Sequence, residues 1–409
     1  MSSCRSAPPP RAPVTLSVVR LADLRGYASA EVRFGPGPQL LWGPNAAGKT
    51  SLLETIVLLA WGHSHRTTTD AELIRWGADV ARVEAVVGGD TLEVVLVRPG
   101  GSGVPGGARK RIQVNGVPRR AAALSNALRV VLFAPEEMLL IAGPPALRRA
   151  ALDRIAAARH PAYGPTLAAY TRALQQRNSL LRAIREETAD RDQLRYWDKP
   201  FLDAGGEVVA MRERVLGELA GPLAAAHAEI APEEAGRAAL SLRYETNAPA
   251  RDGENARAAL ERRLADTAEK EAWNGSTLVG PHRDDVAFIL EERDLAGFAS
   301  RGQQRTAILA FKLAELDLLT ALDGRPPLLL LDDVFSELDP DRRSHLVRRI
   351  AALPQAFVTT TTLDDLDPAL LAIADSWRVD ANADQPQGLA NAPTATGATL
   401  TGPSRPGAA

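Results

Sequence analysis

The chain has 409 residues, 45% of them apolar and 24% charged, which is the ordinary balance of a soluble globular protein with a large core and room for two domains or lobes. No run of about eighteen uncharged apolar residues occurs, and residues 1–13 lack the apolar core of a signal peptide, so neither a membrane span nor secretion is expected. The net charge of −2 would not attract a polyanion as a whole, and the single cysteine, Cys4, excludes an internal disulfide framework and fits a reducing cytosol.

The first third of the chain has the pattern of strands around one short loop. Residues 1–13 are Pro, Ser and Arg without periodicity, and we expect them to be disordered. The apolar run 39–42 leads through a glycine-containing loop into a helix that begins near residue 51. The other strands predicted here are 14–21, 30–34, 81–87, 91–97 and 111–114, with a Gly- and Pro-rich hairpin tip at 98–108.

A phosphate-binding loop is predicted between the strand 39–42 and the helix, at Gly43-Pro44-Asn45-Ala46-Ala47-Gly48-Lys49-Thr50-Ser51. In this context, backbone N–H groups and the positive end of the helix dipole surround the phosphates. Lys49 is expected to reach the β- and γ-phosphates, and the Thr50 hydroxyl is expected to bind Mg²⁺. The chain is therefore predicted to bind a nucleoside triphosphate.

The pattern changes after an apolar strand at 130–133. From residue 144 to about 235 the chain is rich in Ala, Leu, Arg and Glu at helical spacing, with breaks at Pro161, Pro165 and Gly205-Gly206. At least three helices are predicted, the middle one near 166–188. Because the breaks come too soon for a sustained heptad, we expect a compact inserted helical lobe and no long coiled coil.

Strands return at 240–244 and 285–290, and a helix is predicted at 301–322. The apolar run 328–331 predicts a buried parallel strand, followed by a helix at 341–353 and a strand at 355–360. The fold class is therefore α/β, a P-loop nucleotide-binding domain with an inserted helical second lobe. The predicted parts are 1–13 (extension), 14–143 (first part of the nucleotide-binding domain), 144–235 (helical lobe), 236–380 (return of the nucleotide-binding domain) and 381–409 (a low-complexity tail, expected to be disordered and too poor in apolar residues to pack).

Asp332 and Asp333 end the apolar strand, as in a Walker B motif. Asp332 is expected to share the Mg²⁺ with Thr50, and Asp333 stands where a general base or water-orienting carboxylate would act. Alone, Leu-Leu-Asp-Asp is equally compatible with a core strand that meets a polar turn. The P-loop upstream and Ser336-Glu337-Leu338-Asp339 downstream favour the catalytic interpretation.

The helix 301–322 opens with Ser300-Arg301-Gly302-Gln303-Gln304. A Ser and a Gly at a helix N-terminus form an anion site, although the same pattern is also an ordinary helix cap. ABC-type ATPases carry at this spacing the signature motif, which docks on the γ-phosphate bound by the opposite subunit. Here Arg301 replaces the usual first glycine of that motif.

With these motifs the chain resembles the RecF family of bacterial recombination-repair ATPases, within the ABC/SMC-like superfamily. Two features are the most specific, the Ser-Arg-Gly-Gln-Gln form of the signature and the stretch Gly280 to Asp285. The resemblance runs in family order over roughly residues 14–380 and is carried by Gly43 to Ile56, Glu72 to Gly77, Phe133 to Glu137, Arg148-Arg149 with Leu152-Asp153, Gln176-Arg177-Asn178 with Leu180-Leu181, Trp197-Asp198, Gly280 to Asp285, Ser300 to Arg305 and Leu330 to Asp339.

Two positions depart from the family pattern. Ala46 stands where many relatives have Gly, which leaves the loop geometry there open. Leu24-Arg25-Gly26-Tyr27 replaces a more usual Phe-Arg-Asn-Tyr, but Arg25 keeps its expected place near the nucleotide.

The resemblance implies a slow, DNA-dependent ATPase of the cytoplasm, associated with the nucleoid, with an ABC-type head. It implies ATP and Mg²⁺ as ligands and an ATP-dependent homodimer on gapped DNA or on single-strand–double-strand junctions. It also implies cooperation with RecO and RecR in loading the RecA recombinase, and release from DNA after hydrolysis.

By matching positions, the resemblance implies that residues 43–51 and Arg25 bind ATP and that Lys49, Asp332 and Asp333 are catalytic. Ser300, Gly302 and Gln303, with Arg301 and Gln304 beside them, would contact the ATP of the partner. Ser336 and Asp339 would lie in a loop used across the dimer.

Two basic clusters are candidates for DNA contact, Arg109-Lys110-Arg111 and the set Arg148, Arg149 and Arg177, although such clusters are more often solvated faces or intramolecular pairs. Arg66 follows the P-loop helix and is a candidate for assisting the transition state. His282 has no second ligand at metal spacing, which favours a hydrogen-bonding role, and His63 and His65 are interpreted as polar loop residues.

Two other classes of protein share a P-loop of this kind. A transporter's nucleotide-binding subunit would need a Leu-Ser-Gly-Gly signature and a membrane-coupling partner. A structural SMC-type protein would need a long coiled coil. The Ser-Arg-Gly-Gln signature and the short helical segments favour the repair ATPase over both.

Overall fold

The computed structural model describes residues 14–99, 107–236, 238–364, 366–382 and 397–404. The chain divides into two compact units, which we call unit 1 (Met1–Glu137 with Leu319–Ala409) and unit 2 (Met138–Leu318). The predicted disordered extension at 1–13 lies outside the described residues. Within the described part of the chain, no helix is long and apolar enough to cross a membrane.

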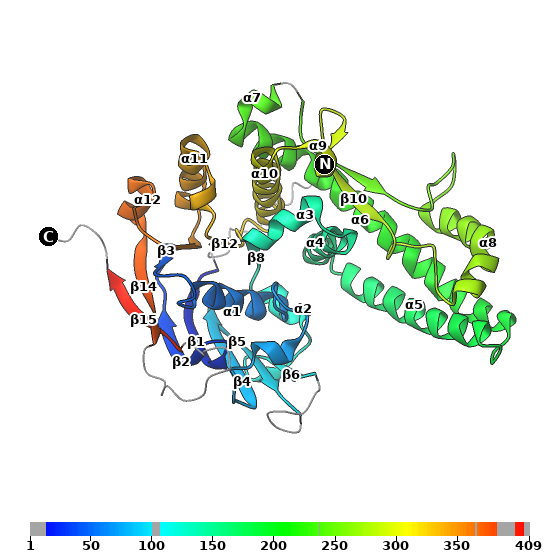
Figure 1. Cartoon of the computed structure of the whole chain (residues 1–409), viewed down its shortest axis with the longest axis horizontal. Helices are drawn as coiled ribbons and strands as arrows, with labels where there is room; N and C mark the ends of the chain where they lie inside the picture. The colour runs from blue at the N-terminus through cyan, green and yellow to red at the C-terminus, as the bar shows by residue number, and fades with distance from the viewer. Residues whose placement is uncertain (1–13, 100–106, 237, 365, 383–396, 405–409) are drawn as a thin grey trace, which may run out of the picture. The chain divides into compact units, whose positions relative to one another are not determined.

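The first sheet of unit 1 is antiparallel and has six strands in the order β2-β1-β4-β5-β6-β7 (Figure 1). All five strands predicted between residues 14 and 114 outside the P-loop strand are confirmed, with shifted ends. In β4, buried and exposed side chains alternate as the sequence does. The strands are β1 (Leu16–Leu24), β2 (Tyr27–Arg33), β4 (Val80–Val87), β5 (Asp90–Val97), β6 (Arg109–Val114) and β7 (Val117–Pro118).

The second sheet of unit 1 has the order β15-β14-β3-β13-β12-β8, and all neighbours are parallel except the edge pair β14–β15. The P-loop strand β3 and the Walker B strand β12 are therefore not adjacent, because β13 lies between them. Every residue of β12 is buried, as its apolar run predicts. The strands are β3 (Gly37–Trp42), β8 (Val130–Phe133), β12 (Leu328–Asp332), β13 (Gln355–Thr360), β14 (Asp375–Asn382) and β15 (Gly397–Ser404).

The helix α1 (Lys49–Trp61) contacts strands of both sheets, β4 and β5 of the first and β8, β12 and β13 of the second. It is buried almost all round, which is the pattern of a helix in the centre of a core. One hydrophobic cluster consequently joins the two sheets and anchors the helix that follows the P-loop. The other helices of unit 1 are η1 (Asp70–Leu73), α2 (Ala122–Ala127), η4 (Phe335–Glu337), α11 (Pro340–Ala351) and α12 (Pro368–Ile373), and η2 (Pro135–Met138) spans the boundary.

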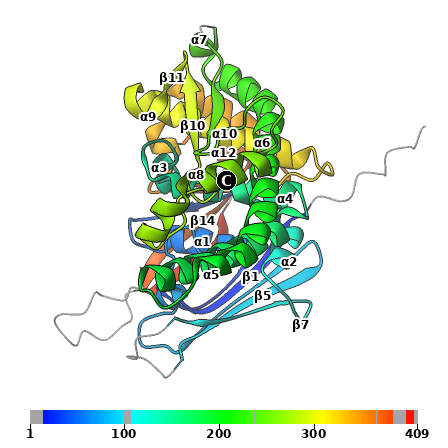
Figure 2. The same cartoon turned by 90° about the vertical axis from the view of Figure 1, so that its right-hand side faces the viewer.

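Three long helices of unit 2 pack against one another, α5 (Tyr163–Arg185), α6 (Arg195–Ile230) and α8 (Ala256–Asn274) (Figure 2). A three-stranded antiparallel sheet, β11-β10-β9, accompanies them. The remaining elements are α3 (Leu139–Ala142), α4 (Pro145–Arg159), η3 (Arg191–Leu194), α7 (Pro232–Ala235), β9 (Ser241–Glu245), β10 (Asp285–Leu290), β11 (Arg293–Asp294), α9 (Leu295–Phe298) and α10 (Arg301–Thr320), whose last two residues fall in unit 1.

The predicted helix break at Gly205-Gly206 is wrong, because α6 runs through both glycines without interruption. A Cβ atom on Gly206 would lie 2.8 Å from the Cβ of Arg257, and one on Gly205 would lie 3.2 Å from the Tyr170 ring. The two glycines therefore allow α5 and α8 to approach α6 closely. Their role is in packing, which local propensity does not reveal.

Unit 2 is longer than the helical lobe expected at 144–235. The segment 236–318, which the sequence suggested as part of the returning ATPase head, groups with the helices because β9 packs on α6 and β10 packs on α4. Strand pairing over long sequence distances decides this grouping, so the change from helix to strand pattern does not mark a boundary between units.

Part of the expected tail is also structured. β14 continues to Asn382, and β15 pairs with it antiparallel. Backbone hydrogen bonds form this edge, and they need no apolar side chains. The rest of the predicted tail, 383–396 and 405–409, lies outside the described residues.

A buried ionic network holds the helices of unit 2 to the loop around Gly280. Arg177 is 2% exposed, and its guanidinium reaches Glu271 at 2.7 Å, Asp198 at 2.8 Å and the Thr277 hydroxyl at 2.9 Å. Glu271 has no exposed surface, so its charge depends on Arg177 for compensation. The network joins α5, the start of α6 and the end of α8.

Replacing Arg177→Ala is expected to destabilise unit 2 by about 3–5 kcal/mol, because it leaves the Glu271 carboxylate buried without a counter-charge. Hydrogen exchange of the α5 and α8 amides measures this loss directly. The matched control is Arg191→Ala, which removes an exposed arginine from its pair with the exposed Glu269 and should leave exchange unchanged. Equal protection in the Arg177 variant and the parent would contradict the role assigned to the network.

Candidate nucleotide site

The backbone of the predicted P-loop adopts conformations that favour glycine. Gly43 and Gly48 have φ of 147° and 113°, and a Cβ on Gly43 would lie 2.1 Å from the carbonyl oxygen of Val379 in β14. Gly43 is therefore required both by its own φ and by the neighbouring strand. Ala46 has φ of 62°, a left-handed conformation that costs about 1–2 kcal/mol for a residue with a Cβ, so a glycine would fit this position without that cost.

Lys49 begins α1 and is folded back over its own loop. Its Nζ donates hydrogen bonds to the carbonyl oxygens of Gly43 at 2.7 Å and Pro44 at 2.9 Å, and the side chain is buried. Burial lowers the pKa of Lys49, and the carboxylates of Asp333 and Asp332 partly oppose that shift. The ammonium is held at the rim of the loop, between backbone acceptors and two carboxylates.

The start of α1 and the ends of two strands meet at Asp332. Its Oδ1 accepts hydrogen bonds from the Thr50 hydroxyl at 3.1 Å and from the Thr359 hydroxyl at 2.6 Å. Thr50 follows β3, Asp332 ends β12, and Thr359 belongs to β13 between them. In open parallel sheets, ligands bind at this carboxyl edge.

The same two groups fit a magnesium ion. Octahedral Mg²⁺ has bonds of 2.0–2.1 Å, so neighbouring ligand atoms are about 3 Å apart. The Thr50 Oγ1 and Asp332 Oδ1 are 3.1 Å apart. Mg²⁺ in nucleotide sites uses one or two such protein oxygens and takes the rest from phosphates and water.

Asp333 has a left-handed backbone with φ of 53°, a region that few residues other than Gly occupy, although Asp and Asn enter it more readily than most. Its N–H donates to the Thr359 hydroxyl at 3.0 Å, and its carbonyl accepts from the Ser336 hydroxyl at 3.0 Å. Backbone strain of this kind gathers at functional sites. Asp339 caps α11 by accepting from the Arg342 N–H, so Ser336 and Asp339 belong to one ordered turn after β12.

Arg25 is held by Glu54, one helical turn after Thr50 on α1. The guanidinium donates to both carboxylate oxygens at 2.8 and 2.6 Å and also to the carbonyl of Glu72 at 3.0 Å. Ser64 donates a third hydrogen bond to Glu54. Although burial acts to raise it, the pKa of Glu54 lies below its usual value because Arg25, Ser64 and Arg66 stabilise the carboxylate.

The polar loop after α1 lies against the same carboxylate. Arg66 is shared between Glu54 at 3.9 Å and Glu136 at 3.5 Å. Both ring nitrogens of His65 are buried without a hydrogen-bond partner, and burial lowers the pKa of this histidine. The loop therefore places an arginine and a neutral imidazole in the electrostatic surroundings of Glu54 and Asp332.

The signature residues lie in unit 2, where they cap their own helix. The Gln303 N–H donates to the Ser300 hydroxyl at 3.2 Å, and the Ser300 N–H donates to the Gln303 side-chain carbonyl at 3.1 Å. This reciprocal pair is a capping box at the start of α10. Arg301 and Gly302 are exposed, and Gln304 reaches the Leu295 carbonyl at 3.5 Å.

The structure argues against DNA contact by three of the predicted arginines. Arg177 is buried in the network described above. Arg148 makes a bidentate pair with Asp285 at 2.7 Å and also donates to three carbonyls at the end of α3, and Arg149 donates to the Asp284 carbonyl at 2.7 Å. These guanidinium groups hold unit 2 together, which agrees with the alternative that such clusters form intramolecular pairs.

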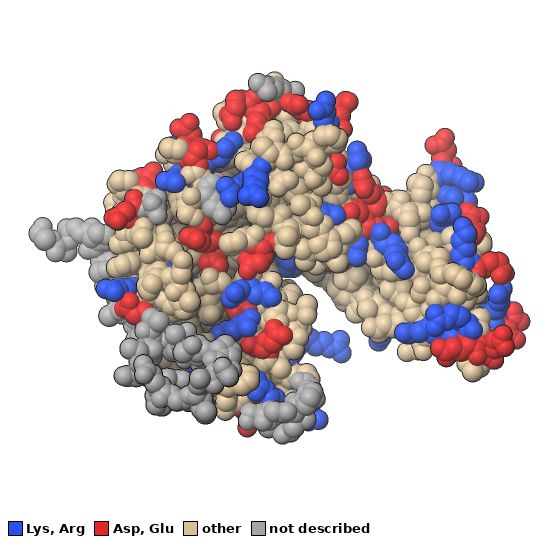
Figure 3. All heavy atoms as spheres, in the orientation of Figure 1, with Lys and Arg blue, Asp and Glu red and all other residues tan. Residues whose placement is uncertain are grey.

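The other basic cluster is divided by the strand alternation of β6. Arg109 and Arg111 point to one face and are exposed, whereas Lys110 points to the other and binds Asp70 and the Gly62 carbonyl. On the face drawn in Figure 3, basic and acidic side chains are interspersed, in keeping with the net charge of −2.

His282 takes part in hydrogen bonds at both ring nitrogens, to the Tyr170 hydroxyl at 2.6 Å and the Thr277 carbonyl at 3.3 Å. Burial lowers its pKa to about 4. Among the described residues, no group of three or more His, Cys, Asp or Glu side chains is placed to hold a metal.

Sequence reasoning missed three residues of the site. Thr359 lies in a run of threonines with no motif, and only the position of β13 between β3 and β12 brings it to Asp332. Glu54 has no motif of its own and looks like an ordinary helix residue. An acidic residue in an otherwise apolar, buried helix nevertheless indicates a paired carboxylate. Tyr27 donates its hydroxyl to the Gly48 carbonyl at 3.2 Å, which supports the P-loop from β2.

Comparison with known proteins agrees with this geometry. A family model described as an AAA domain matches residues 19–94. The DNA replication and repair protein RecF of Symbiobacterium thermophilum is 40% identical over 358 residues, covering 86% of this chain and 92% of the relative.

Two solved structures are similar as well. One is the recombination mediator protein RecF with ATP, from the RecFOR pathway, with a TM-score of 0.80 and 27% identity over 93% of this chain and 98% of that one. The other, the Smc head domain of Pyrococcus furiosus bound to part of ScpA, is 14% identical with a TM-score of 0.50 over 95% of this chain and 96% of that one, and it shows a shared fold only. The P-loop ATPase head predicted from the sequence is confirmed, and the chain belongs to the RecF family of DNA replication and repair proteins.

Proposed function

We propose that this chain is an ATPase of recombinational repair that binds ATP with Mg²⁺, dimerises around two ATP molecules and holds DNA in that state. The observation that supports it most directly is the meeting of the Thr50 hydroxyl with the Asp332 carboxylate at the end of the P-loop strand. That arrangement suits the phosphates and the metal of a nucleoside triphosphate.

ATP binding uses groups that the chain already holds in place. The P-loop N–H groups and the N-terminus of α1 surround the phosphates, and Lys49 exchanges its two carbonyl acceptors for the β- and γ-phosphates. Thr50 and Asp332 would hold the Mg²⁺, which would neutralise charge on the phosphates. Glu54 keeps Arg25 against α1, near the nucleotide.

Hydrolysis depends on Asp333. Its carboxylate orients a water molecule toward the γ-phosphorus and accepts the proton as the new P–O bond forms and the bond to ADP breaks. The Thr359 hydroxyl fixes the backbone of Asp333 and at the same time donates to Asp332, so the metal and the base are positioned by one side chain. Arg66 stabilises the negative charge that develops on the phosphates in the transition state.

The second half of each site comes from a partner copy. Ser300, Gly302 and Gln303 reach the γ-phosphate held by the other subunit, with Arg301 and Gln304 beside them, and the phosphate replaces the capping bonds between Ser300 and Gln303. Because ATP then favours the dimer, DNA affinity is linked to the nucleotide, and hydrolysis releases the DNA. Ser336 and Asp339 contribute to the same interface.

The substrate DNA is gapped or junction DNA, and the partners are RecO and RecR, with RecA loaded downstream in the cytoplasm, at the nucleoid. Membership of the RecF family supports these assignments, because the resemblance to that family implies this DNA and these partners. Arg109 and Arg111 remain the proposed phosphate contacts, because they are exposed on one face of β6.

Lys49→Ala should weaken ATP binding by about 3 kcal/mol, roughly 100-fold, because two charge-assisted hydrogen bonds to phosphate are lost. Isothermal titration calorimetry with ATP and Mg²⁺ measures the change. The matched control is Lys199→Ala, which removes an exposed lysine of α6 that pairs with Asp203. ATP affinity equal to that of the parent would contradict the role given to Lys49.

Asp333→Asn should lower kcat by about 10²–10⁴-fold and leave ATP affinity and the ATP-dependent dimer intact, because the amide cannot accept the proton of the water. Steady-state ATPase assays and sedimentation report the two properties separately. Asp341→Asn, at an exposed acid in the first turn of α11, is the control. If the Asp333 variant also failed to dimerise, the residue would serve assembly and not hydrolysis.

Sedimentation velocity should find a dimer with ATP and a monomer with ADP or without nucleotide. A gapped duplex should stabilise the dimer more than a blunt duplex of equal length. A chain that remains monomeric under all these conditions would contradict the proposed ATP-dependent dimer.

The double substitution Arg109→Glu with Arg111→Glu should weaken DNA binding and flatten its salt dependence in titrations of a gapped duplex at several salt concentrations. Unchanged affinity would remove these two residues from the DNA surface.

A further inference from the structure

A small hollow lies beside the signature motif in unit 2. It has a volume of about 180 Å³ and is lined by residues from the end of β10, from β11 and α9 and from the first turn of α10. Gln303, which closes the capping box with Ser300, forms one of its walls. The hollow and the signature motif are therefore one continuous surface.

Phe298 stands at this hollow with 77% of its surface exposed. It ends α9, a single turn that Asp294 caps by accepting from the Ala296 N–H and that the buried Leu295 anchors below. The guanidinium of Arg293 lies 5.9 Å from the centre of the Phe298 ring. A large aromatic side chain is thus presented to solvent on an anchored turn, two residues before Ser300.

We infer that Phe298, with Arg293 over its ring, is a docking element for a second copy of this chain. The inference rests on the proposed ATP dimer and names a residue of its interface. Aromatic side chains and arginine are enriched at interfaces between proteins, where a few well-packed side chains carry most of the binding energy.

The surroundings of Phe298 point to a protein occupant. Gln303 in the wall is proposed to reach the ATP of the second copy, so a surface of that copy must come to the hollow when the signature engages. The rim carries Glu291 and Asp294 next to Arg293. Two carboxylates beside one guanidinium disfavour a DNA backbone, whereas a mixed-sign rim can match the mixed-sign surface of another copy.

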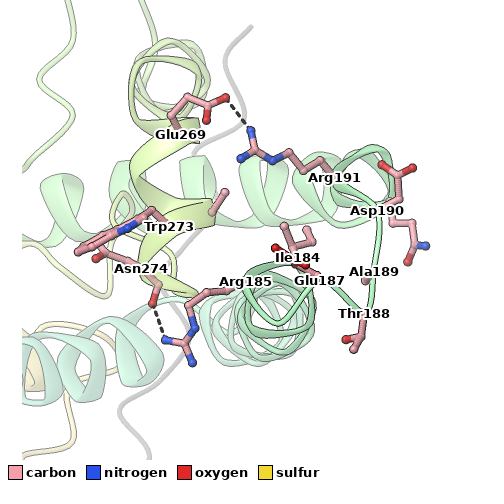
Figure 4. A pocket seen from close by; sticks show the side chains of 12 residues that line it. Ile184, Arg185, Glu187, Thr188, Ala189, Asp190, Arg191, Glu269, Trp273 and Asn274 are labelled. Atoms are coloured by element: carbon pink, nitrogen blue, oxygen red, sulfur yellow. Dashed lines mark hydrogen bonds and ion pairs between the residues drawn. The ribbon is translucent and has the colours of Figure 1, made fainter.

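Unit 2 offers a matched control in a different hollow, at the ends of α5 and α8 (Figure 4). This hollow has a volume of about 1400 Å³, and it is bounded by the ion pair of Arg191 with Glu269 and the hydrogen bond from Arg185 to the Asn274 carbonyl. Trp273 lines it and is 80% exposed. It contains no signature residue, so removing Trp273 shows the effect of losing an exposed aromatic side chain that lies away from the signature motif.

The experiment compares Phe298→Ser, Trp273→Ser and the parent by sedimentation equilibrium in ATP and Mg²⁺. Phe298→Ser should raise the dimer dissociation constant by about tenfold or more, as expected for the loss of an interface hot spot. Trp273→Ser should change it by less than about twofold. ATP binding by the dilute monomer should be the same in all three proteins, because the P-loop belongs to unit 1.

ATPase activity gives a second readout. The loss of activity in Phe298→Ser should be recovered when the protein concentration is raised above the new dissociation constant, which a defect in the chemical step would not allow. A variant that dimerises like the parent, or a Trp273→Ser chain that is weakened equally, overturns the inference and leaves the proposed function standing. A parent chain that never dimerises in ATP overturns both.

Discussion

The candidate site depends on the hydrogen bonds that Asp332 accepts from Thr50 and Thr359. They join the first turn of α1 to the carboxyl ends of β12 and β13, and they place the hydroxyl of the P-loop helix beside the carboxylate of the Walker B strand. The close approach of β14 to Gly43 fixes the start of the loop, and α1 is fixed by the core that both sheets share. The phosphate loop is therefore held by packing contacts at both of its ends, and preorganisation of this kind lowers the ordering cost of binding a nucleotide.

Charge in this molecule has two different uses. In unit 2, Arg177 and Arg148 are surrounded by carboxylates and carbonyls, and their contribution is to hold helices and loops in one arrangement. At the P-loop, Lys49 donates to neutral backbone carbonyls, and Arg66 lies 3.9 and 3.5 Å from two carboxylates. Groups held in this second way can exchange their partners for phosphate oxygens at small cost, because no buried charge is left uncompensated.

The signature motif illustrates how one pattern serves two states. Ser300 and Gln303 satisfy each other at the start of α10, which is the ordinary capping alternative that the sequence left open. The same N–H and hydroxyl groups are suited to a phosphate, since both lie at the N-terminus of α10, which is the positive end of the helix. In the proposed dimer, one set of hydrogen bonds replaces the other, and the equilibrium between them depends on ATP held by a second copy.

The sequence by itself determined most of the local elements and indicated where a nucleotide would bind. Alternation and apolar runs predicted β4, β10, β12 and β13, because each depends on a periodicity of neighbouring residues. Motif spacing located the P-loop and Asp332, because the loop and the strand end are each local. The tertiary structure alone decided which strand lies between them, and hence the part played by Thr359. It also decided that Gly205-Gly206 serves close helix packing, that Arg177 is buried with Glu271, and that β15 completes a sheet from a segment poor in apolar residues. These features arise from contacts between residues far apart in the chain, and no local pattern records such contacts.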